Sequence, residues 1–299
     1  MSKSKKTLIL YDSVEYFMSY MESQETDVFR IYRKRNFVIS LFKRAFLKLN
    51  IFCSVWYESW VQNLSSYNTV LVFATRDYTF IRRIKKRYPN IRIIFWYWNP
   101  AFRMGVPRNE LYSLAEIWSF DPADCVRYAL NFNTTFYFRG ISLQSEKIKY
   151  DAFFLGINKG RREFLEGLKK KLDRWSINTY FYIVPDKKEK EIEEKKPIPY
   201  HEYLYLLSQS SCIIDIMPQG QTGLTLRAME SLFFCKKLIT NDLSILNQDF
   251  YSPHNIFVLE KDNLESIRQF IDEPYKSINP DIVNKYDFNS WLNRFDGNG

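Results

Sequence analysis

The chain of 299 residues has few of the residues that build metal sites and covalent frameworks. It contains four cysteines, which lie far apart with no C-x-x-C pair, and two histidines. This argues against a disulfide framework, a zinc site and a His-rich metal site, and it fits a reducing cytosol. No run of 18 uncharged apolar residues is present, and the apolar stretch at residues 7–10 is too short for a signal-peptide core. The sequence therefore predicts neither a membrane span nor a cleaved leader.

Apolar residues make up 46% of the chain, which is enough for a packed core and excludes wholesale disorder. The formal net charge is +9, but it is distributed unevenly. Residues 1–150 carry 23 Lys and Arg against 12 Asp and Glu, whereas residues 151–299 carry 20 against 22. The basic first half predicts an anionic partner, either nucleic acid or the anionic inner leaflet of a membrane.

Short apolar runs alternate with longer amphipathic stretches, which is typical of βα units and a parallel sheet. Strands are predicted at residues 7–11, 69–74, 92–96, 116–120, 134–138, 152–156, 178–184, 212–217, 237–240 and 255–258. Helices are predicted at residues 78–88, 121–131, 160–175, 200–208, 223–234 and 264–271. The pattern starts afresh near residue 151, so we predict an α/β protein with two Rossmann-like domains, residues 1–148 and 149–279. A last helix within residues 280–299 could pack on either domain.

Glycine is scarce, with nine residues in the chain, and two of them flank the end of the predicted strand 152–156. Gly156 ends this strand, and Gly160 precedes the helix, with Lys159, Arg161 and Arg162 beside them. Free amides of a first helical turn, the helix dipole and fixed cations together favour anion binding. We therefore predict a phosphate site here; the alternative is an ordinary βα turn with surface basic residues.

A second glycine pair, Gly220 and Gly223, follows the predicted strand 212–217. Thr222 is a predicted N-cap, and Gly223, Arg227 and Glu230 would lie at i, i+4 and i+7 on one face of the next helix. A nucleoside diphosphate offers phosphates and a ribose diol in the matching order, and an ionised glutamate accepts hydrogen bonds from both ribose hydroxyls. The alternative is an intrahelical Arg227–Glu230 ion pair.

These residues carry a family resemblance. Residues 230–239, Glu-Ser-Leu-Phe-Phe-Cys-Lys-Lys-Leu-Ile, resemble the E-A-M-A-C-G-x-P-V-I segment of GT-B glycosyltransferases, and residues 221–227 resemble the Gly-Leu start of the same helix. The nearest likeness is to bacterial transferases that assemble capsule, lipopolysaccharide or exopolysaccharide. The resemblance is specific over residues 153–240 and only architectural over residues 1–150.

The chain also departs from that family pattern. The earlier family glutamate would fall at Thr222, while Cys235 and Lys237 replace the family's glycine and proline. Inversion or retention at the sugar is therefore not decided. No Asp-x-Asp is present, which argues against the metal-dependent GT-A class.

The resemblance implies two Rossmann-like domains that face a central cleft, and a transferase that needs neither metal nor cofactor. It would move a sugar from a nucleotide-sugar donor, with UDP as the expected nucleotide, to a lipid-linked glycan. Arg227 would balance charge on the leaving diphosphate, and Glu230 would hold the ribose. The implied donor-binding residues are Gly156, Asn158, Lys159, Arg161, Pro185, Gln221, Thr222, Gly223 and Glu230.

Two aspartates of the first half follow predicted strands and are candidate general bases for an inverting reaction. Asp12 follows the strand 7–11, and Asp77 follows the strand 69–74. Either could take a proton from an acceptor hydroxyl. The alternative is that each caps a helix, which is a common role for an aspartate after a strand.

Basic and apolar residues interleave at near-helical spacing in residues 30–48. This pattern predicts an interfacial amphipathic segment that binds anionic lipid, and a second basic run at residues 82–87 would add to its field. The alternative is a helix packed on the sheet. The prediction places the protein in the cytoplasm, peripheral at the inner face of the cell membrane, through Arg33, Lys34, Arg35, Lys43 and Arg44.

Two other functions fit the composition. A sugar-nucleotide epimerase would keep the fold and change the reaction, although two histidines favour this reading less. A basic, aromatic nucleic-acid binder is the non-enzymatic alternative, but no recognised DNA- or RNA-binding motif is present, and we expect no nucleic-acid partner.

Overall fold

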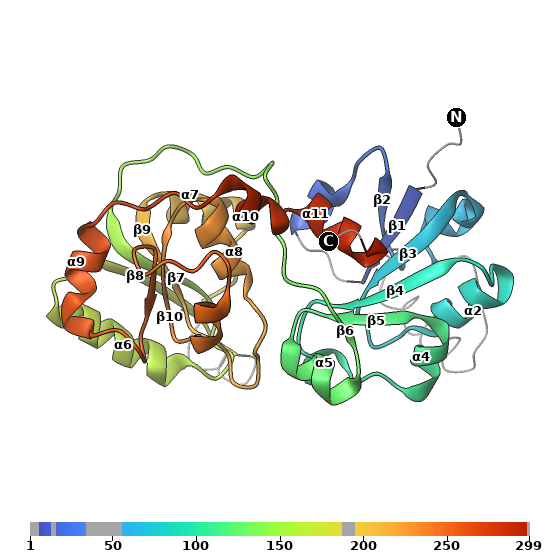
Figure 1. Cartoon of the computed structure of the whole chain (residues 1–299), viewed down its shortest axis with the longest axis horizontal. Coiled ribbons are helices and arrows are strands. Elements are labelled where there is room, and N and C mark those ends of the chain that lie inside the picture. The colour runs from blue at the N-terminus through green and yellow to red at the C-terminus, as the bar shows by residue number, and fades with distance from the viewer. Residues whose placement is uncertain (1–5, 13–15, 34–55, 187–194, 298–299) are drawn as a thin grey trace. The chain divides into compact units, whose positions relative to one another are not determined.

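The computed structural model describes residues 6–12, 16–33, 56–186 and 195–297 (Figure 1). The chain divides into two compact units, Met1–Asn133 and Thr134–Gly299. Each unit contains one parallel β-sheet with helices packed against it. The predicted α/β class with two Rossmann-like units is confirmed.

The first unit has a parallel sheet in the order β2-β1-β3-β4-β5-β6. The central strands β1, β3 and β4 are apolar runs with buried centres, as expected for a parallel sheet covered on both faces, whereas the edge strands β2 and β6 are not. They are β1 (Lys6–Tyr11), β2 (Thr26–Arg30), β3 (Tyr67–Phe73), β4 (Arg92–Tyr97), β5 (Glu116–Ser119) and β6 (Asn131–Phe132). The helices are η1 (Tyr16–Met21), η3 (Ser59–Gln62), η4 (Leu64–Ser66), α2 (Thr79–Arg87), α3 (Ala101–Met104), α4 (Asn109–Leu114) and α5 (Pro122–Tyr128).

The second unit has a parallel sheet in the order β11-β10-β9-β7-β8. The strands are β7 (Tyr150–Ile157), β8 (Thr179–Val184), β9 (Ser210–Asp215), β10 (Lys237–Thr240) and β11 (Ile256–Val258). The helices are α6 (Arg162–Arg174), α7 (Tyr200–Ser208), α8 (Leu226–Phe233), η5 (Leu243–Asn247), η6 (Leu264–Ser266), α9 (Ile267–Asp272), α10 (Pro280–Lys285), α11 (Phe288–Asn293) and η7 (Arg294–Asp296).

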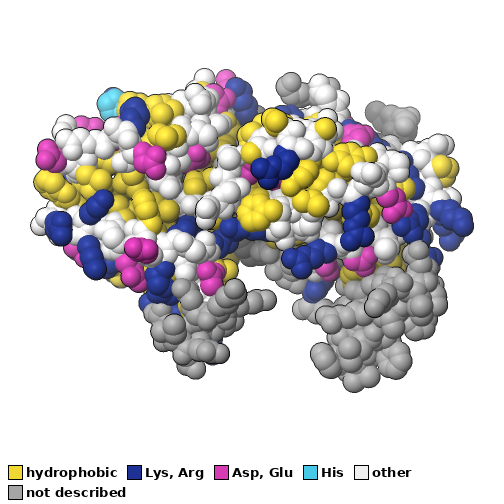
Figure 2. All heavy atoms as spheres, turned by 90° about the horizontal axis from the view of Figure 1, so that it is seen from below, with side chains coloured by type: hydrophobic (Ala, Val, Ile, Leu, Met, Phe, Trp, Pro, Cys, Tyr) yellow, Lys and Arg dark blue, Asp and Glu magenta, His cyan; other side chains and the backbone are white. Residues whose placement is uncertain are grey.

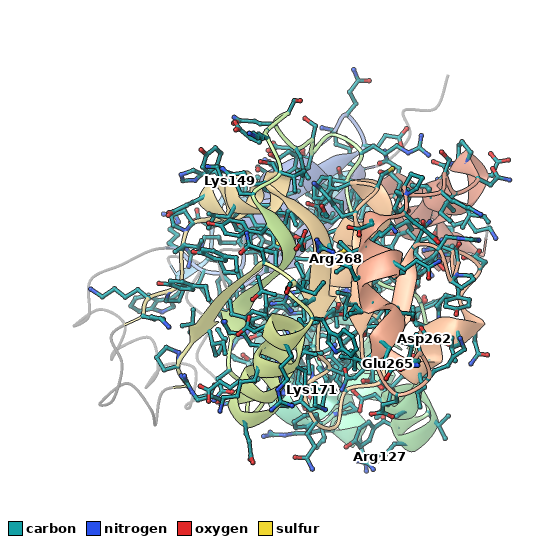
Figure 3. The ribbon with its side chains drawn as sticks, turned by 90° about the vertical axis from the view of Figure 1, so that its left-hand side faces the viewer. Arg127, Lys149, Lys171, Asp262, Glu265 and Arg268 are labelled. Atoms are coloured by element: carbon teal, nitrogen blue, oxygen red, sulfur yellow. The ribbon has the colours of Figure 1, made fainter. Side chains whose placement is uncertain are left out.

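Helices cover both faces of the second sheet. Leucines of α6 and apolar residues of α9 share one core cluster with Phe154, Ile214 and Ile239 of the strands. On the other face, Phe153 of β7 contacts Tyr203 of α7. Figure 3 shows α6 and α9 with Lys171 and Arg268 labelled on them. β7 has β8, the next strand in the chain, on one side and β9 on the other. The order of the strands therefore reverses between β7 and β9, which makes this place the topological switch point of the sheet.

The segment that follows the first unit packs against the C-terminal helices of the second unit. Tyr137 donates its N–H to the Tyr286 carbonyl at 2.8 Å, and the Phe288 N–H donates to the Tyr137 carbonyl at 2.9 Å. The rings of Phe136 and Trp291 lie 4.2 Å apart. Residues 134–148 therefore belong to the second unit, although the sequence predicts the boundary at residue 148 and a strand at 134–138, where the structure has a single bridge at Tyr137.

The predicted last helix is two short helices, α10 and α11. Tyr286 is the C-cap of the first, and Asp287 caps the second, because its side chain accepts a hydrogen bond from the Asn289 N–H. Both helices lie in the second unit. In the described part of the chain, no helix has the length and apolar character needed to cross a lipid bilayer. On the face drawn in Figure 2, Lys and Arg side chains are scattered over the surface rather than gathered into one patch.

Candidate functional site

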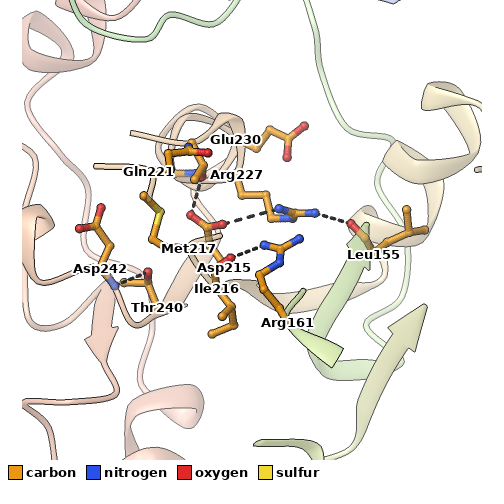
Figure 4. A network of polar contacts seen from close by, with 12 residues as sticks. Leu155, Arg161, Asp215, Ile216, Met217, Gln221, Arg227, Glu230, Thr240 and Asp242 are labelled. Carbon is orange, nitrogen blue, oxygen red and sulfur yellow. Dashed lines mark hydrogen bonds and ion pairs between the residues drawn. The ribbon is translucent and has the colours of Figure 1, made fainter. Parts of the chain in front are cut away.

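The strands β7 and β9 separate before they end, and an arginine enters the gap between them (Figure 4). Their ladder runs from Tyr150 to Phe153 on β7, where Phe153 faces Ile213, and the Leu155 carbonyl beyond it needs another donor on this side. Arg227 of α8 supplies it, since its Nη2 donates to the Leu155 carbonyl at 2.6 Å. Arg227 thus completes the sheet at the switch point.

A second arginine, Arg161, closes the same gap further along. It is 6% exposed, its Nη2 donates to the Ile157 carbonyl at 2.7 Å, and its Nη1 donates to the Ile216 carbonyl. The residue directly precedes α6, so the helix start holds it in place. Two guanidinium groups therefore lie side by side at the carboxyl edge of the sheet, where ligands bind in open α/β folds.

The two cations share one aromatic ring, and one of them, Arg227, faces a carboxylate. The Cζ atoms of Arg161 and Arg227 lie 5.4 Å and 5.0 Å from the ring centroid of Phe154, which stabilises both guanidiniums from below. Asp215 at the end of β9 is 2% exposed, and its Oδ1 lies 3.6 Å from Nη1 of Arg227. The Nε of Arg227 is buried and has no hydrogen-bond partner among the described residues. Within the described residues, the cluster thus contains one buried donor, Nε of Arg227, and one buried acceptor, Oδ1 of Asp215, that make no hydrogen bond.

Gly156 makes room for Arg227. A Cβ atom at this position would lie 2.2 Å from Nη2 of Arg227, which no pair of non-bonded atoms tolerates. A glycine is therefore needed at position 156 for packing, because a larger residue would collide with the Arg227 guanidinium that binds the Leu155 carbonyl.

The turn between β7 and α6 holds an anion. Lys159 and Gly160 adopt left-handed backbone conformations, with φ of 49° and 79°. Their N–H groups donate to the two carboxylate oxygens of Asp186, each at 3.1 Å. Consecutive amides in such a turn form an anion-binding concavity, and here the chain's own carboxylate occupies it. Asn158 supports the turn, because its Oδ1 accepts the N–H of Arg161 at 2.7 Å.

Asp186 follows Pro185 at the end of β8, the strand next to β7. Pro185 is buried and ends the strand, so it positions Asp186 rather than presenting a side chain of its own. The sequence reasoning missed Asp186, although an acidic residue directly after a strand at this edge of the sheet was a signal that could have found it.

Helix α8 begins three residues later than predicted. Thr225 is its N-cap, and the Thr225 side chain accepts the N–H of Ala228 at 3.2 Å and donates to Asp215. The prediction of Thr222 as the N-cap and Gly223 as a helical residue is wrong, because Asp215 fixes the later threonine. Residues 222 and 223 lie in the preceding turn, where the Gln221 side chain donates to the Gly223 carbonyl at 3.3 Å.

Glu230 points into the interior of the unit. It is 1% exposed, and its carboxylate accepts hydrogen bonds from Tyr200, at 2.8 Å, and from Tyr203. The Tyr200 hydroxyl also contacts the hydroxyl of Tyr137. Burial raises the pKa of Glu230 to about 7, against the hydrogen bonds from both tyrosines and the charge of Arg227, which lower it.

This placement corrects two expectations. A carboxylate enclosed by phenols cannot reach a ribose diol, so the predicted ribose contact of Glu230 does not hold. The alternative, an ion pair between Arg227 and Glu230, is also absent from the described residues, since Arg227 turns to β7 and Glu230 turns to α7.

The two candidate bases lie in the first unit, at the carboxyl ends of the neighbouring strands β1 and β3. Asp12 is exposed, and its Oδ2 accepts the hydroxyl of Thr75 at 3.3 Å. Asp77, which lies one residue before the N-cap of α2, accepts the hydroxyl of Tyr32 at 2.6 Å and the N–H of Thr79 at 3.1 Å, so its carboxylate is already hydrogen-bonded at the start of this helix. Burial, followed by the negative charge of Asp77, raises the pKa of Tyr32.

Most of the predicted membrane segment lies outside the described residues. Arg33 is exposed, and its N–H donates to the Trp56 carbonyl at 3.0 Å. Lys34, Arg35, Lys43 and Arg44 are not among the residues that the structure describes, so the membrane prediction stays a prediction.

Comparison with known proteins finds similarity in structure alone. No protein-family model matches the chain, and no curated protein sequence matches it. A co-structure of S. aureus MnaA with UDP aligns at 10% identity and a TM-score of 0.44, over 94% of this chain and 91% of that chain. The UDP-GlcNAc 2-epimerase of Methanocaldococcus jannaschii aligns at 13% identity and a TM-score of 0.47, over 97% of this chain and 98% of that chain.

These structures correct the predicted activity. Neither printed name is that of a glycosyltransferase, and the second is that of an epimerase, so the glycosyltransferase prediction is corrected and is not retained. The predicted lipid-linked glycan acceptor loses its basis with it. At this identity the likeness concerns the fold, and the residues of the site have to be judged by their own geometry.

Proposed function

We propose that the second unit binds the diphosphate of a nucleotide sugar at the turn of Lys159 and Gly160, and that the chain is a sugar-nucleotide epimerase. The observation that carries the proposal is the pair of amides that already binds one carboxylate, that of Asp186, with both oxygens at 3.1 Å. A phosphate group presents oxygens of the same kind with more charge, so it would compete for the same two donors.

The surroundings of the turn support a phosphate more than a carboxylate. The turn lies at the N-terminus of the 13-residue helix α6, whose dipole favours negative charge. Arg161 follows directly, and its guanidinium and that of Arg227 lie over the same Phe154 ring, so two positive charges lie close together beside the turn. A diphosphate could use both features, with one phosphate on the amides and the other near the guanidiniums.

The epimerase part of the proposal takes its substrate class from the solved structures to which the chain is similar, whose names print UDP and UDP-GlcNAc. UDP-GlcNAc, which gives the M. jannaschii epimerase its name, is the first substrate to test.

Binding is tested by calorimetry of the full chain with UDP and with uridine. We expect UDP to bind at least tenfold more tightly than uridine, because the diphosphate supplies the recognised charge. Asp186→Ala should strengthen UDP binding by roughly tenfold, since a charged hydrogen-bond acceptor no longer competes. Asp173→Ala, which removes an exposed aspartate at the other end of α6, is the matched control and should leave the affinity unchanged.

Equal binding of UDP and uridine, together with no effect of Asp186→Ala, would contradict the diphosphate site. The activity is tested separately, by NMR of UDP-GlcNAc incubated with the protein in deuterated buffer. Epimerisation should produce a second sugar isomer with deuterium at the inverted carbon. Tight UDP binding without any isomer or deuterium would remove the epimerase and leave the nucleotide site intact.

A further inference from the structure

The first unit contains an apolar pocket that the proposed function does not use. It lies between α2 and the short helices η3 and η4, and its volume is about 400 Å³, which is within the range of small-molecule sites. Two of the lining side chains, Trp60 and Phe80, are almost fully buried, with ring centroids 6.3 Å apart. The apolar lining consists of Trp60, Val61, Leu64, Phe80, Ile84 and Tyr88.

Three cations of α2 line the same pocket, namely Arg83, Lys86 and Arg87. They are spaced at i, i+3 and i+4, so one side of the helix presents all of them together. Within the described residues, neither Lys86 nor Arg87 has an ion pair, and the Arg87 guanidinium lies 5.7 Å from the ring centroid of Tyr88. Three positive charges therefore lie beside the apolar interior of the pocket.

The other two basic residues of the run 82–87 are engaged elsewhere. Arg82 pairs with Glu110 of α4, and its Nη2 donates at 2.8 Å. Lys85 donates to the Ile91 carbonyl at 2.8 Å and to the Pro89 carbonyl at 3.3 Å, which stabilises the end of α2. The basic run is therefore divided between fold stability and the pocket.

We infer that this pocket binds a single amphipathic organic anion, with an alkyl chain or ring inside and a phosphate or carboxylate beside Lys86 and Arg87. An apolar group that enters would leave water, while its anionic end would meet cations that lack carboxylate partners among the described residues. A concave site of this volume accommodates one molecule, and a flat basic surface, as a membrane or a nucleic acid would need, requires no apolar interior. The site is independent of the nucleotide site, which lies in the second unit.

The inference is tested with butyl, hexyl and octyl phosphate, with inorganic phosphate as the headgroup alone, by calorimetry on the full chain. Affinity should rise about tenfold from butyl to hexyl and again toward octyl, because each buried CH2 contributes to transfer from water. Inorganic phosphate should bind at least a hundredfold more weakly than octyl phosphate.

Arg87→Gln should weaken octyl phosphate binding by roughly threefold to tenfold. Arg127→Gln is the matched control, since Arg127 is also an exposed arginine in the last turn of a helix of the first unit, and it should change nothing. Affinity that ignores chain length, or an equal effect of both substitutions, would reduce the pocket to diffuse surface charge and overturn the inference. Binding to vesicles of anionic phospholipid that octyl phosphate does not displace would overturn it as well.

Discussion

Replacing Glu230 by glutamine should make the second unit more stable at alkaline pH than the wild type. The wild-type carboxyl is 1% exposed, and burial raises its pKa from 4.5 to about 7. A difference of this size between the folded and unfolded chain corresponds to about 3 kcal/mol at 1.36 kcal/mol for each pH unit. Glutamine keeps the shape of the side chain and does not ionise, so it avoids that cost.

The direction follows from where the proton is bound. Between pH 4.5 and pH 7 the folded state keeps Glu230 protonated while the unfolded state has lost the proton. The stability that this proton contributes is complete below pH 4.5 and is lost as the pH rises to about 7. Relative to the wild type, the stability of the variant should therefore increase by about 2.5 kcal/mol between pH 5 and pH 8, since part of the full effect is already lost at pH 5.

Urea unfolding of both proteins at pH 5, 6, 7 and 8 measures this difference. Hydrogen exchange of peptides from α7 and α8 assigns it to the second unit. Glu202→Gln is the matched control, because Glu202 is an exposed glutamate in the first turn of α7, beside Tyr203. Its stability profile should stay within about 0.5 kcal/mol of the wild type across the range.

Parallel stability profiles of the wild type and Glu230→Gln would refute the reasoning. They would mean that the carboxyl titrates alike in the folded and unfolded chain, which a buried group held by Tyr200 and Tyr203 should not do. The same variant should bind UDP as the wild type does, because Glu230 faces α7 rather than the turn of Lys159 and Gly160. A large loss of UDP affinity would restore a ligand role for Glu230.

Two other substitutions test the same unit. Tyr203→Phe removes one hydrogen-bond donor to Glu230. It should lower the free energy of unfolding by about 1.5–3 kcal/mol at pH 8, where the acceptor is charged, and by less at pH 5. Equal losses in urea unfolding at both pH values would contradict this. Gly156→Ala should cost about 1–3 kcal/mol in unfolding, because the added Cβ meets Arg227 at 2.2 Å and displaces it from the strand. Gly167→Ala, in open space on α6, is its control and should be neutral or stabilising, and equal losses in the two would refute the close contact.

Two elements of the second unit were predicted with the bounds that the structure has. The predicted ranges 237–240 and 200–208 coincide with β10 and α7. In contrast, β2 (Thr26–Arg30) was not predicted, because it is an edge strand with charged residues among its five. Its Asp27 is satisfied by Lys6 and Tyr67, which lie on other strands, and such partners cannot be read from a local pattern.

The position of the turn at Lys159 and Gly160 could be predicted from the sequence, but the carboxylate that it binds could not. A glycine after a buried strand, followed by basic residues and a helix, indicated Lys159 and Gly160 from local sequence alone. That Asp186 fills the turn depends on the pairing of β7 with β8, which brings residues 26 and 27 positions apart into contact. Likewise, Thr222 and Thr225 are equally good caps by type, and Asp215 on β9 decides between them.

The misplacement of Glu230 shows how a spacing argument fails when the partner of a helix face is unknown. Arg227 and Glu230 are three residues apart, so the sequence allows both to face one ligand. In the folded unit α8 packs along β9 and β10, with α7 beside it, and the two side chains diverge to different neighbours. The signal for the actual partner was present on α7, where Tyr200 and Tyr203 are also three residues apart and so present two hydroxyls on one side. Two phenols at that spacing, facing a helix with one glutamate, are what a buried carboxylate needs to remain in an apolar core.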